Sequence, residues 1–354
     1  MANYSNSEIN SAIEVFYNTR NKLIVHAPTG SNVSINCEGT TINGTEISNS
    51  GTWYFYYPKF GRWTVSGTNG QNLGTDYVDI YEVKDYTLTL EISTSISNNL
   101  ESSSWSDIQI IAQSSLGSSY WRIGDSKTVV LNGSAKSLTF NNVSVGAYII
   151  GFDHNSNIEG IGIHFQLGRM NSADICFNDS KYNISYILSP GYNGNNYFVW
   201  CRDNGDGNPR TEYLWINGNM QQRILGQDIN NPIGFLSCLP VSLLPCLKFV
   251  DKYSTEGLSN NLLFLLSAKE VLAENIGSYY IYQRQYDYYT NHSAIKGDYS
   301  NGGVNPKNYY LRDTTGSRTG NGLGSYVYII TEQGSLSNVG VWVDECVAPV
   351  FVVG

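Results

Sequence analysis

Short runs with apolar side chains at alternate positions fill residues 21 to 96 of this 354-residue chain. The runs read KLIVHAP, SNVSINCEG, GTWYFYYP, GRWTVSGT, DYVDIYEV and DYTLTLEI. A two-residue period is typical of a strand with one buried face, and turn residues separate each run from the next. The pattern therefore predicts a small antiparallel β-sandwich over residues 21 to 96.

The remainder of the chain predicts a domain that mixes strands and short helices over residues 105 to 354. The segment from Tyr326 to Ile329 alternates as a strand does, and Gly334 supplies a turn before the chain returns. Residues 211 to 275 combine apolar positions with prolines, which favours short helices over one long helix. The predicted fold class is mainly β, with an N-terminal β-sandwich and an α+β C-terminal domain.

Two segments lie outside these domains. Residues 97 to 104 read SNNLESSS and have the composition of a linker. Residues 1 to 20 contain apolar positions spaced for one short amphipathic helix, which we interpret as an attachment segment.

The first domain carries short motifs in a recognisable order. Ala27-Pro28-Thr29-Gly30 is followed by Gly51-Thr52-Trp53 and then by Gly61-Arg62-Trp63-Thr64-Val65. Together they resemble the immunoglobulin-like or prealbumin-like modules of phage tail and bacterial surface proteins. The resemblance implies a spacer, in which Trp53 and Trp63 fill the core.

The second domain carries a longer series of blocks in order. They include Ser104 to Ile108, Tyr120 to Asp125, Ile149 to His154, Ile163 to Leu167, Leu263 to Ser267, and the final stretch from Tyr309. The series resembles the C-type-lectin-like domains of uncharacterised proteins from Gram-positive gut bacteria and their phages. The resemblance implies that strands hold out polar loops, such as the one from Asp313 to Ser325, for binding.

Charge and composition exclude several partners. The net charge is −9, and the 21 lysines and arginines are scattered, so nucleic acid is not an expected partner. No apolar run is long enough to insert into a membrane. The N-terminus lacks the features of a signal peptide, although the Gly-, Ser-, Asn- and Tyr-rich composition is typical of extracellular proteins. This combination favours a virion protein that is assembled in the host cytoplasm and exposed on the particle surface.

Candidate catalytic and metal-binding groups are few. The four histidines fall in no known catalytic motif, and the six cysteines lack the spacing of a zinc site, so we expect buried thiols. Cys346 has no second cysteine nearby in sequence, which argues against the cysteine chemistry of the related formylglycine-generating enzymes. The acidic turn from Asp203 to Asn208 lacks calcium-loop spacing. We expect no enzyme activity, cofactor or metal.

A tyrosine-rich segment with polar neighbours is the best candidate for ligand binding. Tyrosine combines a stiff apolar face with a polar tip, which suits both sugars and proteins. The predicted ligand-binding residues are Tyr286, Tyr288, Tyr289, His292, Tyr299, Tyr309, Arg318 and Asn321.

The sequence as a whole predicts a phage structural protein at the tail tip or a fibre, which binds a host-surface glycan or protein. Other virion proteins and further copies of the chain, for instance in a trimer, are the expected partners. A capsid decoration or head-fibre protein and a bacterial surface adhesin remain alternatives. An enzyme on the same fold would require His154, His164 or Cys346 to converge with a carboxylate in a pocket.

Overall fold

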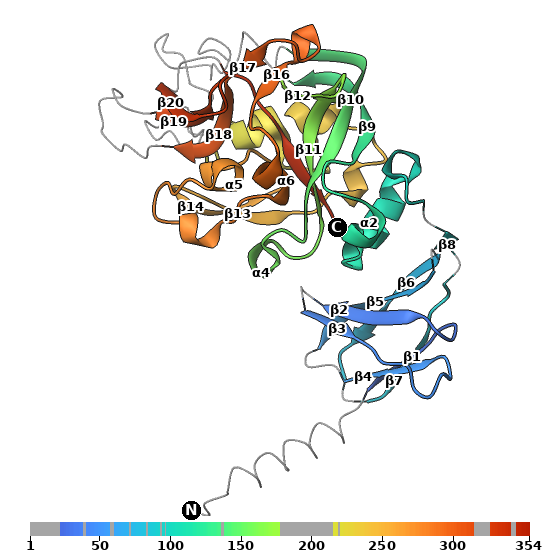
Figure 1. Cartoon of the computed structure of the whole chain (residues 1–354). Helices are drawn as coiled ribbons and strands as arrows, with labels where there is room; N and C mark the ends of the chain where they lie inside the picture. The colour runs from blue at the N-terminus through green and yellow to red at the C-terminus, as the bar shows by residue number, and fades with distance from the viewer. Residues whose placement is uncertain are drawn as a thin grey trace, which may run out of the picture. The chain divides into compact units, whose positions relative to one another are not determined.

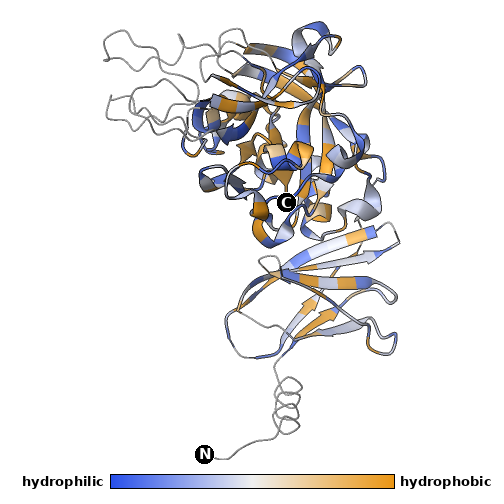
Figure 2. Cartoon of the chain, turned by 60° about the vertical axis from the view of Figure 1, so that its left-hand side comes forward, coloured by the Kyte–Doolittle hydropathy of each residue, from blue (hydrophilic) through white to orange (hydrophobic). Residues whose placement is uncertain are grey.

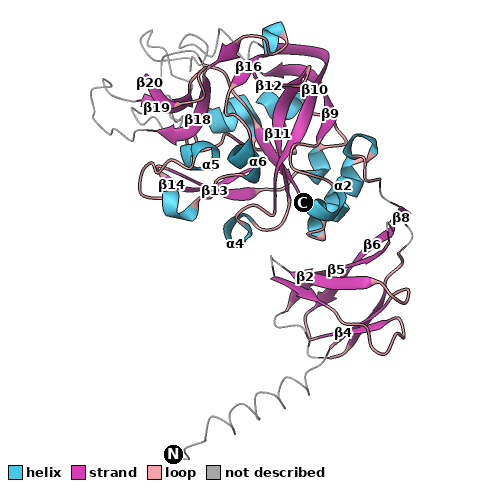
Figure 3. Ribbon diagram, viewed as in Figure 1, coloured by secondary structure: helices cyan, strands magenta, loops and turns pink. Residues whose placement is uncertain are grey.

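The computed structural model describes residues 22–37, 40–56, 60–70, 72–82, 84–92, 94–95, 97–135, 138–177, 215–218, 220–314, 326–340 and 345–354. The chain divides into two compact units, residues 1–97 and 98–354 (Figure 1). Strands predominate and form several sheets, so the prediction of a mainly β protein is confirmed (Figure 3). The predicted N-terminal helix, the turn from Asp203 to Asn208, and Arg318 with Asn321 lie outside the described residues.

The first unit contains two sheets. The three-stranded sheet comprises, in spatial order, β4 (Thr52–Phe55), β1 (Leu23–His26) and β7 (Tyr86–Thr89). The five-stranded sheet comprises β3 (Thr40–Asn43), β2 (Asn32–Cys37), β5 (Gly61–Asn69), β6 (Asn72–Ile80) and β8 (Thr94–Ser95). All pairs are antiparallel except β1 with β7, which are parallel, so the expectation of a wholly antiparallel arrangement is corrected.

Alternate residues of these strands share one buried core. Trp53 and Trp63 lie in it at 1% and 0% exposure, together with Val25, Ile35 and Val65. Figure 2 shows the resulting alternation of hydrophobic and hydrophilic residues along the strands. The expectation that both tryptophans belong to the core is confirmed.

The second unit begins inside the predicted linker. A 3₁₀ turn, Leu100–Ser102, buries Leu100, and Ser104 caps α2 (Trp105–Gln113) through a capping box with Asp107. In this box the Ser104 side chain accepts from the Asp107 N–H, and the carboxylate accepts from the Ser104 N–H. Residues 97 to 104 are therefore not a plain linker, because Asn99, Ser103 and Ser104 serve as helix caps. A short helix, α3 (Gly117–Tyr120), follows.

An eight-stranded sheet forms the centre of this unit. Its members are β9 (Ser126–Ala135), β10 (Leu138–Phe152), β11 (Ile163–Met170), β12 (Ala173–Cys176), β15 (Leu263–Phe264), β16 (Lys296–Asp298), β17 (Pro306–Lys307) and β21 (Val350–Val353). β11 lies between β10 and β21, and its first six residues are all buried. The C-terminal strand β21 is thus part of the core.

Smaller elements surround this sheet. The strands form a hairpin of β13 (Val250–Ser254) with β14 (Gly257–Asn261), and a three-stranded sheet of β18 (Tyr309–Thr314), β19 (Tyr326–Ile330) and β20 (Leu336–Gly340). The short α-helices are α4 (Ser156–Glu159), α5 (Ala268–Leu272) and α6 (Asp287–Asn291). Helical turns occur at Met220–Gly226, Gly234–Cys238, Leu244–Cys246, Tyr280–Tyr282 and Tyr299–Asn301.

The prediction of short helices over residues 211 to 275 needs a correction. Helical turns do occupy its described part as far as Cys246, and α5 lies near its end, but strands β13, β14 and β15 lie between them. Alternating burial of Val250, Lys252 and Ser254 reveals the two-residue period. The charge of Lys252 at an inward position hides this period in the sequence, because lysine is rarely buried unless it is paired.

Candidate functional site

Three tyrosine rings form a stack on the outer side of the β13–β14 hairpin. Tyr253 lies between Tyr282 and Tyr279, with ring centroids 4.7 and 5.7 Å apart and interplanar angles of 22° in both pairs. Parallel aromatic rings at such separations attract each other beyond the area that they bury. The three rings therefore hold one another in place.

Exposed apolar side chains lie next to this stack, across the hairpin or in sequence. Leu258 of β14 pairs directly with Tyr253 and is 46% exposed, while Ile281 and Tyr282 are 64% and 45% exposed. We call Tyr253, Leu258, Tyr279, Ile281 and Tyr282 the tyrosine surface. Exposed apolar groups that lie together mark interaction sites more often than single ones do.

The backbone beneath the tyrosine surface is fixed by Gln283, which follows Tyr282, and by polar side chains from two other segments. Arg312 Nε and Gln283 Nε2 donate to the carbonyl oxygen of Tyr253 at 2.7 and 3.2 Å. Asn155 Nδ2 donates to the carbonyl oxygen of Tyr282 at 2.9 Å. These contacts preorganise the rings, which lowers the entropy lost on binding.

A network of buried ionised groups lies on the inner side of the same hairpin. Lys252 Nζ lies 2.5 Å from Glu159 Oε2 and 3.0 Å from Glu270 Oε1, and it donates to Tyr286 Oη at 2.7 Å. Arg312 Nη1 contacts the other Glu270 oxygen at 2.5 Å. We call Glu159, Lys252, Glu270, Tyr286 and Arg312 the charged core. Buried charges of opposite sign compensate one another here, as interior charges require.

Two histidines border the charged core. The His154 ring stacks on Tyr286 with a centroid distance of 3.6 Å, and His164 Nδ1 lies 2.9 Å from Tyr286 Oη. Burial, and then the positive charge of Lys252, hold the pKa of each histidine well below its usual range. Both rings are therefore neutral at physiological pH.

The two glutamates of the charged core differ in their electrostatics. Burial raises the pKa of Glu159 to about 7, despite the nearby Lys252. Burial also opposes ionisation of Glu270, but the charges of Arg312 and Lys252 outweigh it and hold its pKa below the usual range. Glu270 is thus the permanent anion of the pair, whereas Glu159 exchanges a proton near neutrality.

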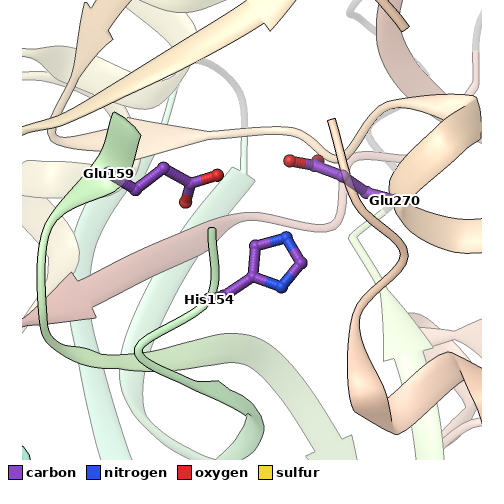
Figure 4. A group of neighbouring side chains, drawn as sticks. All are labelled: His154, Glu159 and Glu270. Atoms are coloured by element: carbon purple, nitrogen blue, oxygen red, sulfur yellow. The ribbon is translucent and has the colours of Figure 1, made fainter. Parts of the chain in front are cut away.

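His154, Glu159 and Glu270 together resemble a metal-binding group. Their ligand atoms lie within 4.8 Å of one another, and the two carboxylates point toward each other (Figure 4). The ammonium group of Lys252 contacts both carboxylates, however, and supplies the positive charge that a metal ion would bring. We therefore assign no metal to this cluster.

The convergence required by the enzyme alternative does occur, since both His154 and His164 lie near Glu159. These side chains are 3%, 0% and 4% exposed, so a substrate cannot reach them in this conformation. The arrangement supports a structural role, in which neutral histidines pack against paired charges.

Four of the predicted ligand-binding residues lie in the interior. Tyr286 belongs to the charged core, and Tyr309 Oη donates to the Ala294 carbonyl oxygen at 2.9 Å. Tyr288 Oη donates to Asp174 at 2.7 Å, and Tyr289 Oη donates to Gln166. All four are at most 5% exposed, so we no longer assign them to a ligand-binding surface.

The polar groups around Tyr288 and Tyr289 form a second buried network. Arg169 Nη2 donates to Tyr288 Oη at 2.6 Å, and Lys296 Nζ donates to Tyr148 Oη at 2.7 Å. Tyr148 in turn donates to Gln166 at 2.9 Å. Their hydroxyl groups let these tyrosines fill a core that also contains charged side chains.

The other predicted residues are partly accessible. His292 is exposed, and its ring stacks on Tyr288 at a centroid distance of 4.0 Å. Tyr299 is half-buried against Phe140 and Phe177. Among the described residues, the ring contacts of His292 and Tyr299 are with Tyr288, Phe140 and Phe177, and none is with the tyrosine stack. The prediction omitted Tyr253 and Leu258, which the outward positions of β13 and β14 reveal only once the hairpin is known.

The cysteines follow the expectation in part. Cys37, Cys176, Cys238, Cys246 and Cys346 are buried thiols, and none of these five described cysteines forms a disulfide. The thiols of Cys346 and Cys176 are hydrogen-bonded, and this contact, with burial, raises the pKa of Cys346 above its usual range. Cys346 therefore has a thiol neighbour, contrary to the sequence-based interpretation, although its pKa makes it a poor nucleophile.

No family model, curated protein or solved structure matches the chain. Among the described residues, the helices are too short or too polar to span a bilayer.

Proposed function

We propose that this chain is a phage structural protein that attaches the particle to a host surface through its second unit. In this proposal the first unit is an immunoglobulin-like or prealbumin-like spacer sandwich, and the second is a C-type-lectin-like domain. Weak individual contacts suffice, because many copies on one particle multiply them. A homo-oligomer such as a trimer would present several tyrosine surfaces together.

The observation that supports adhesion is the tyrosine surface. Its Leu258, Ile281 and Tyr282 side chains are exposed, and Tyr253 and Tyr279 are half-buried. Its backbone is fixed by Arg312, Gln283 and Asn155. Rigid tyrosines provide contact area at little entropic cost, and the face of a ring suits the apolar face of a sugar. Asn260 and Asp251, hydrogen-bonded to each other at 2.9 Å on the same hairpin, add polar groups at the margin. We therefore propose a host-surface glycan as the ligand.

Two other functions share this binding mode. A capsid decoration or head-fibre protein would carry the same surface elsewhere on the particle, and a bacterial surface adhesin would carry it on a cell. Electron cryomicroscopy of the intact particle distinguishes them. Density for the second unit at the tail tip is the expected result, whereas density on the capsid, or no particle at all, would contradict attachment by the tail.

A binding experiment tests the tyrosine surface directly. The full chain is sedimented with isolated Gram-positive cell walls, alone and with Tyr279→Ala and Tyr282→Ala combined. Because exposed aromatic anchors carry much of an interface's energy, we expect the double variant to bind at least about tenfold more weakly. The matched control is Tyr81→Ala in the first unit, where Tyr81 is 67% exposed and should be neutral. Equal binding by the double variant would contradict the assignment.

A further inference from the structure

The long strand β9 has one edge without a partner strand. Among the described strands, β9 pairs with β10 alone, so its other edge borders the eight-stranded sheet (Figure 1). The strand runs for ten residues, from Ser126 to Ala135, and contains no proline. An edge of this kind presents a row of backbone N–H and C=O groups with which another chain can pair.

The register of β9 shows which backbone groups face this open edge. The Thr128 N–H donates to Glu101 Oε2 at 2.6 Å, so it points away from β10. Alternate residues of an antiparallel strand direct their backbone groups to the same side, and the register from Thr128 to Leu131 has no shift. The N–H and C=O of Val130 therefore also point away from β10, and no described residue bonds them there.

A groove of about 460 Å³ follows the same edge. Lys127 and Val130, whose side chains belong to opposite faces of β9, both line it, so the groove reaches around the edge of the sheet. Trp105 at the start of α2 and Pro240 line it as well. The volume lies in the range of pockets that bind ligands.

We propose that the open edge of β9 binds an extended peptide segment of a partner protein, which adds to the sheet as a further strand. The backbone of the peptide pairs with Val130, and its side chains enter the groove. Glu101 already satisfies the Thr128 N–H, so the pairing is centred on Val130. This inference concerns how the chain joins another protein and does not depend on the adhesive function of the tyrosine surface.

The groove indicates which side chains the peptide carries. Trp105, Val130 and Pro240 provide apolar surface, which fits an apolar side chain. Of the residues that line the groove, only Lys127 is charged, and its ammonium group donates to the Glu101 carbonyl oxygen at 2.9 Å. A groove with one positive charge is complementary to a peptide that has an acidic side chain beside the apolar one.

A second copy of the chain fits this edge less well than a single peptide does. Paired with itself, β9 would meet the same Lys127 charge and no acidic side chain from the facing strand. The segments at Trp105 and Pro240, which line the groove, would also be present in both copies beside the same edge. A single extended segment brings neither obstacle.

Selection from a displayed library of short random peptides against the full chain tests the proposal. We expect the enriched peptides to combine apolar and acidic residues, and their synthetic forms to bind the chain in fluorescence anisotropy. Binding should slow hydrogen exchange in the proteolytic fragment that contains β9. Failure to enrich any peptide, or protection elsewhere than in β9, would overturn the proposal. Dimerisation of the chain through β9, without peptide binding, would assign the edge to a second copy and overturn it as well.

Two substitutions at one position distinguish backbone pairing from side-chain contact. Val130→Pro removes an N–H that points away from β10, so the sheet itself loses no hydrogen bond. We expect the enriched peptide to bind this variant at least about tenfold more weakly. The matched control is Val130→Thr, which keeps the N–H and the branched side chain and should bind as the wild type does. Equal binding by Val130→Pro would overturn the proposal, and if that variant fails to fold, the exchange protection of β9 in the wild type still decides.

Discussion

Lys252 and Tyr253 are consecutive residues of β13, yet their side chains belong to opposite sides of the hairpin. Lys252 is 1% exposed among buried carboxylates, whereas Tyr253 stacks between two surface tyrosines. Successive side chains of a strand point to opposite faces, so the charged core and the tyrosine surface share one backbone. A change that loosens the core should therefore also loosen the surface.

A substitution at Arg312, which contacts both the charged core and the backbone of the tyrosine surface, probes this coupling. It donates to the carbonyl oxygens of Tyr253 and Leu265 and pairs with Glu270 while fully buried. Arg312→Met leaves buried acceptors unsatisfied, so we expect the free energy of unfolding to fall by about 3 to 5 kcal/mol. Denaturant titration followed by tryptophan fluorescence measures this loss.

The control for Arg312 is another arginine–carboxylate pair in the same unit. Arg284 contacts Asp287 at 3.3 Å, with both side chains largely exposed. Arg284→Met should cost less than about 1 kcal/mol, because solvent screens exposed ion pairs. Equal losses in both variants would contradict the view that the buried pair is special.

The buried carboxyl group of Asp313 makes the stability of the second unit depend on pH. Burial raises its pKa from 3.8 to about 6, while the charge of Arg312 and the Ala268 N–H oppose the shift. Between pH 6 and pH 4 the folded state then binds a proton that the unfolded state does not. Protonation of Asp313 alone should add about 1 kcal/mol of stability as the pH falls from 7 to 5. His154 and His164 act in the opposite direction over this range, because the fold keeps both rings neutral while the unfolded chain gains their protons. Glu270 does not offset this gain, because its lowered pKa keeps it ionised in this range.

Denaturant midpoints measured from pH 5 to pH 7.5 check this prediction. Asp313→Asn should become less stable relative to the wild type as the pH falls from 7 to 5, by about 1 kcal/mol, because the amide has no proton to gain. Asp287→Asn, an exposed control, should leave the slope unchanged. Glu159, whose pKa burial raises to about 7, acts in the same direction as Asp313, so its contribution remains in the Asp313→Asn profile.

Substitutions at Tyr288 and Tyr282 distinguish a tyrosine that stabilises the core from one that binds the ligand. Tyr288→Phe removes a buried hydroxyl that bonds both Asp174 and Arg169, which should cost about 1 to 3 kcal/mol and leave adhesion unchanged. Tyr282→Ala should do the reverse, with weaker adhesion and a stability change within about 1.5 kcal/mol. Sedimentation with cell walls and thermal denaturation distinguish them. Weaker adhesion in a folded Tyr288→Phe variant would return Tyr288 to the binding surface.

The sequence predicted the mainly β class because apolar alternation depends on local spacing alone. The same pattern predicted the burial of Trp53 and Trp63, since each lies at an inward position of its strand. This prediction did not require knowing which distant residues contact the two tryptophans. This part of the fold could therefore be predicted from neighbouring residues.

The site could not be predicted in the same way. Tyr282 and Tyr286 are four residues apart in one tyrosine-rich segment, yet one is 45% exposed and the other fully buried. The hydroxyl of Tyr286 is tolerated inside because Lys252 and His164 contact it. Those partners come from β13 and β11, so composition around Tyr286 carries no sign of them.

Trp63 offers a test of whether the two units are independently stabilised. It is fully buried in the core of the first unit, and Trp63→Ala should cost about 3 to 5 kcal/mol there. Because residues 1–97 and 98–354 are separate compact units, each with its own core, we expect the second unit to keep its stability. Hydrogen exchange read by peptide mass spectrometry resolves the two, with loss of protection in β2, β5 and β6 but not in β10 and β11. The surface control Tyr81→Ala should leave both patterns intact, whereas loss of protection in β11 of Trp63→Ala would mean that the two units unfold together.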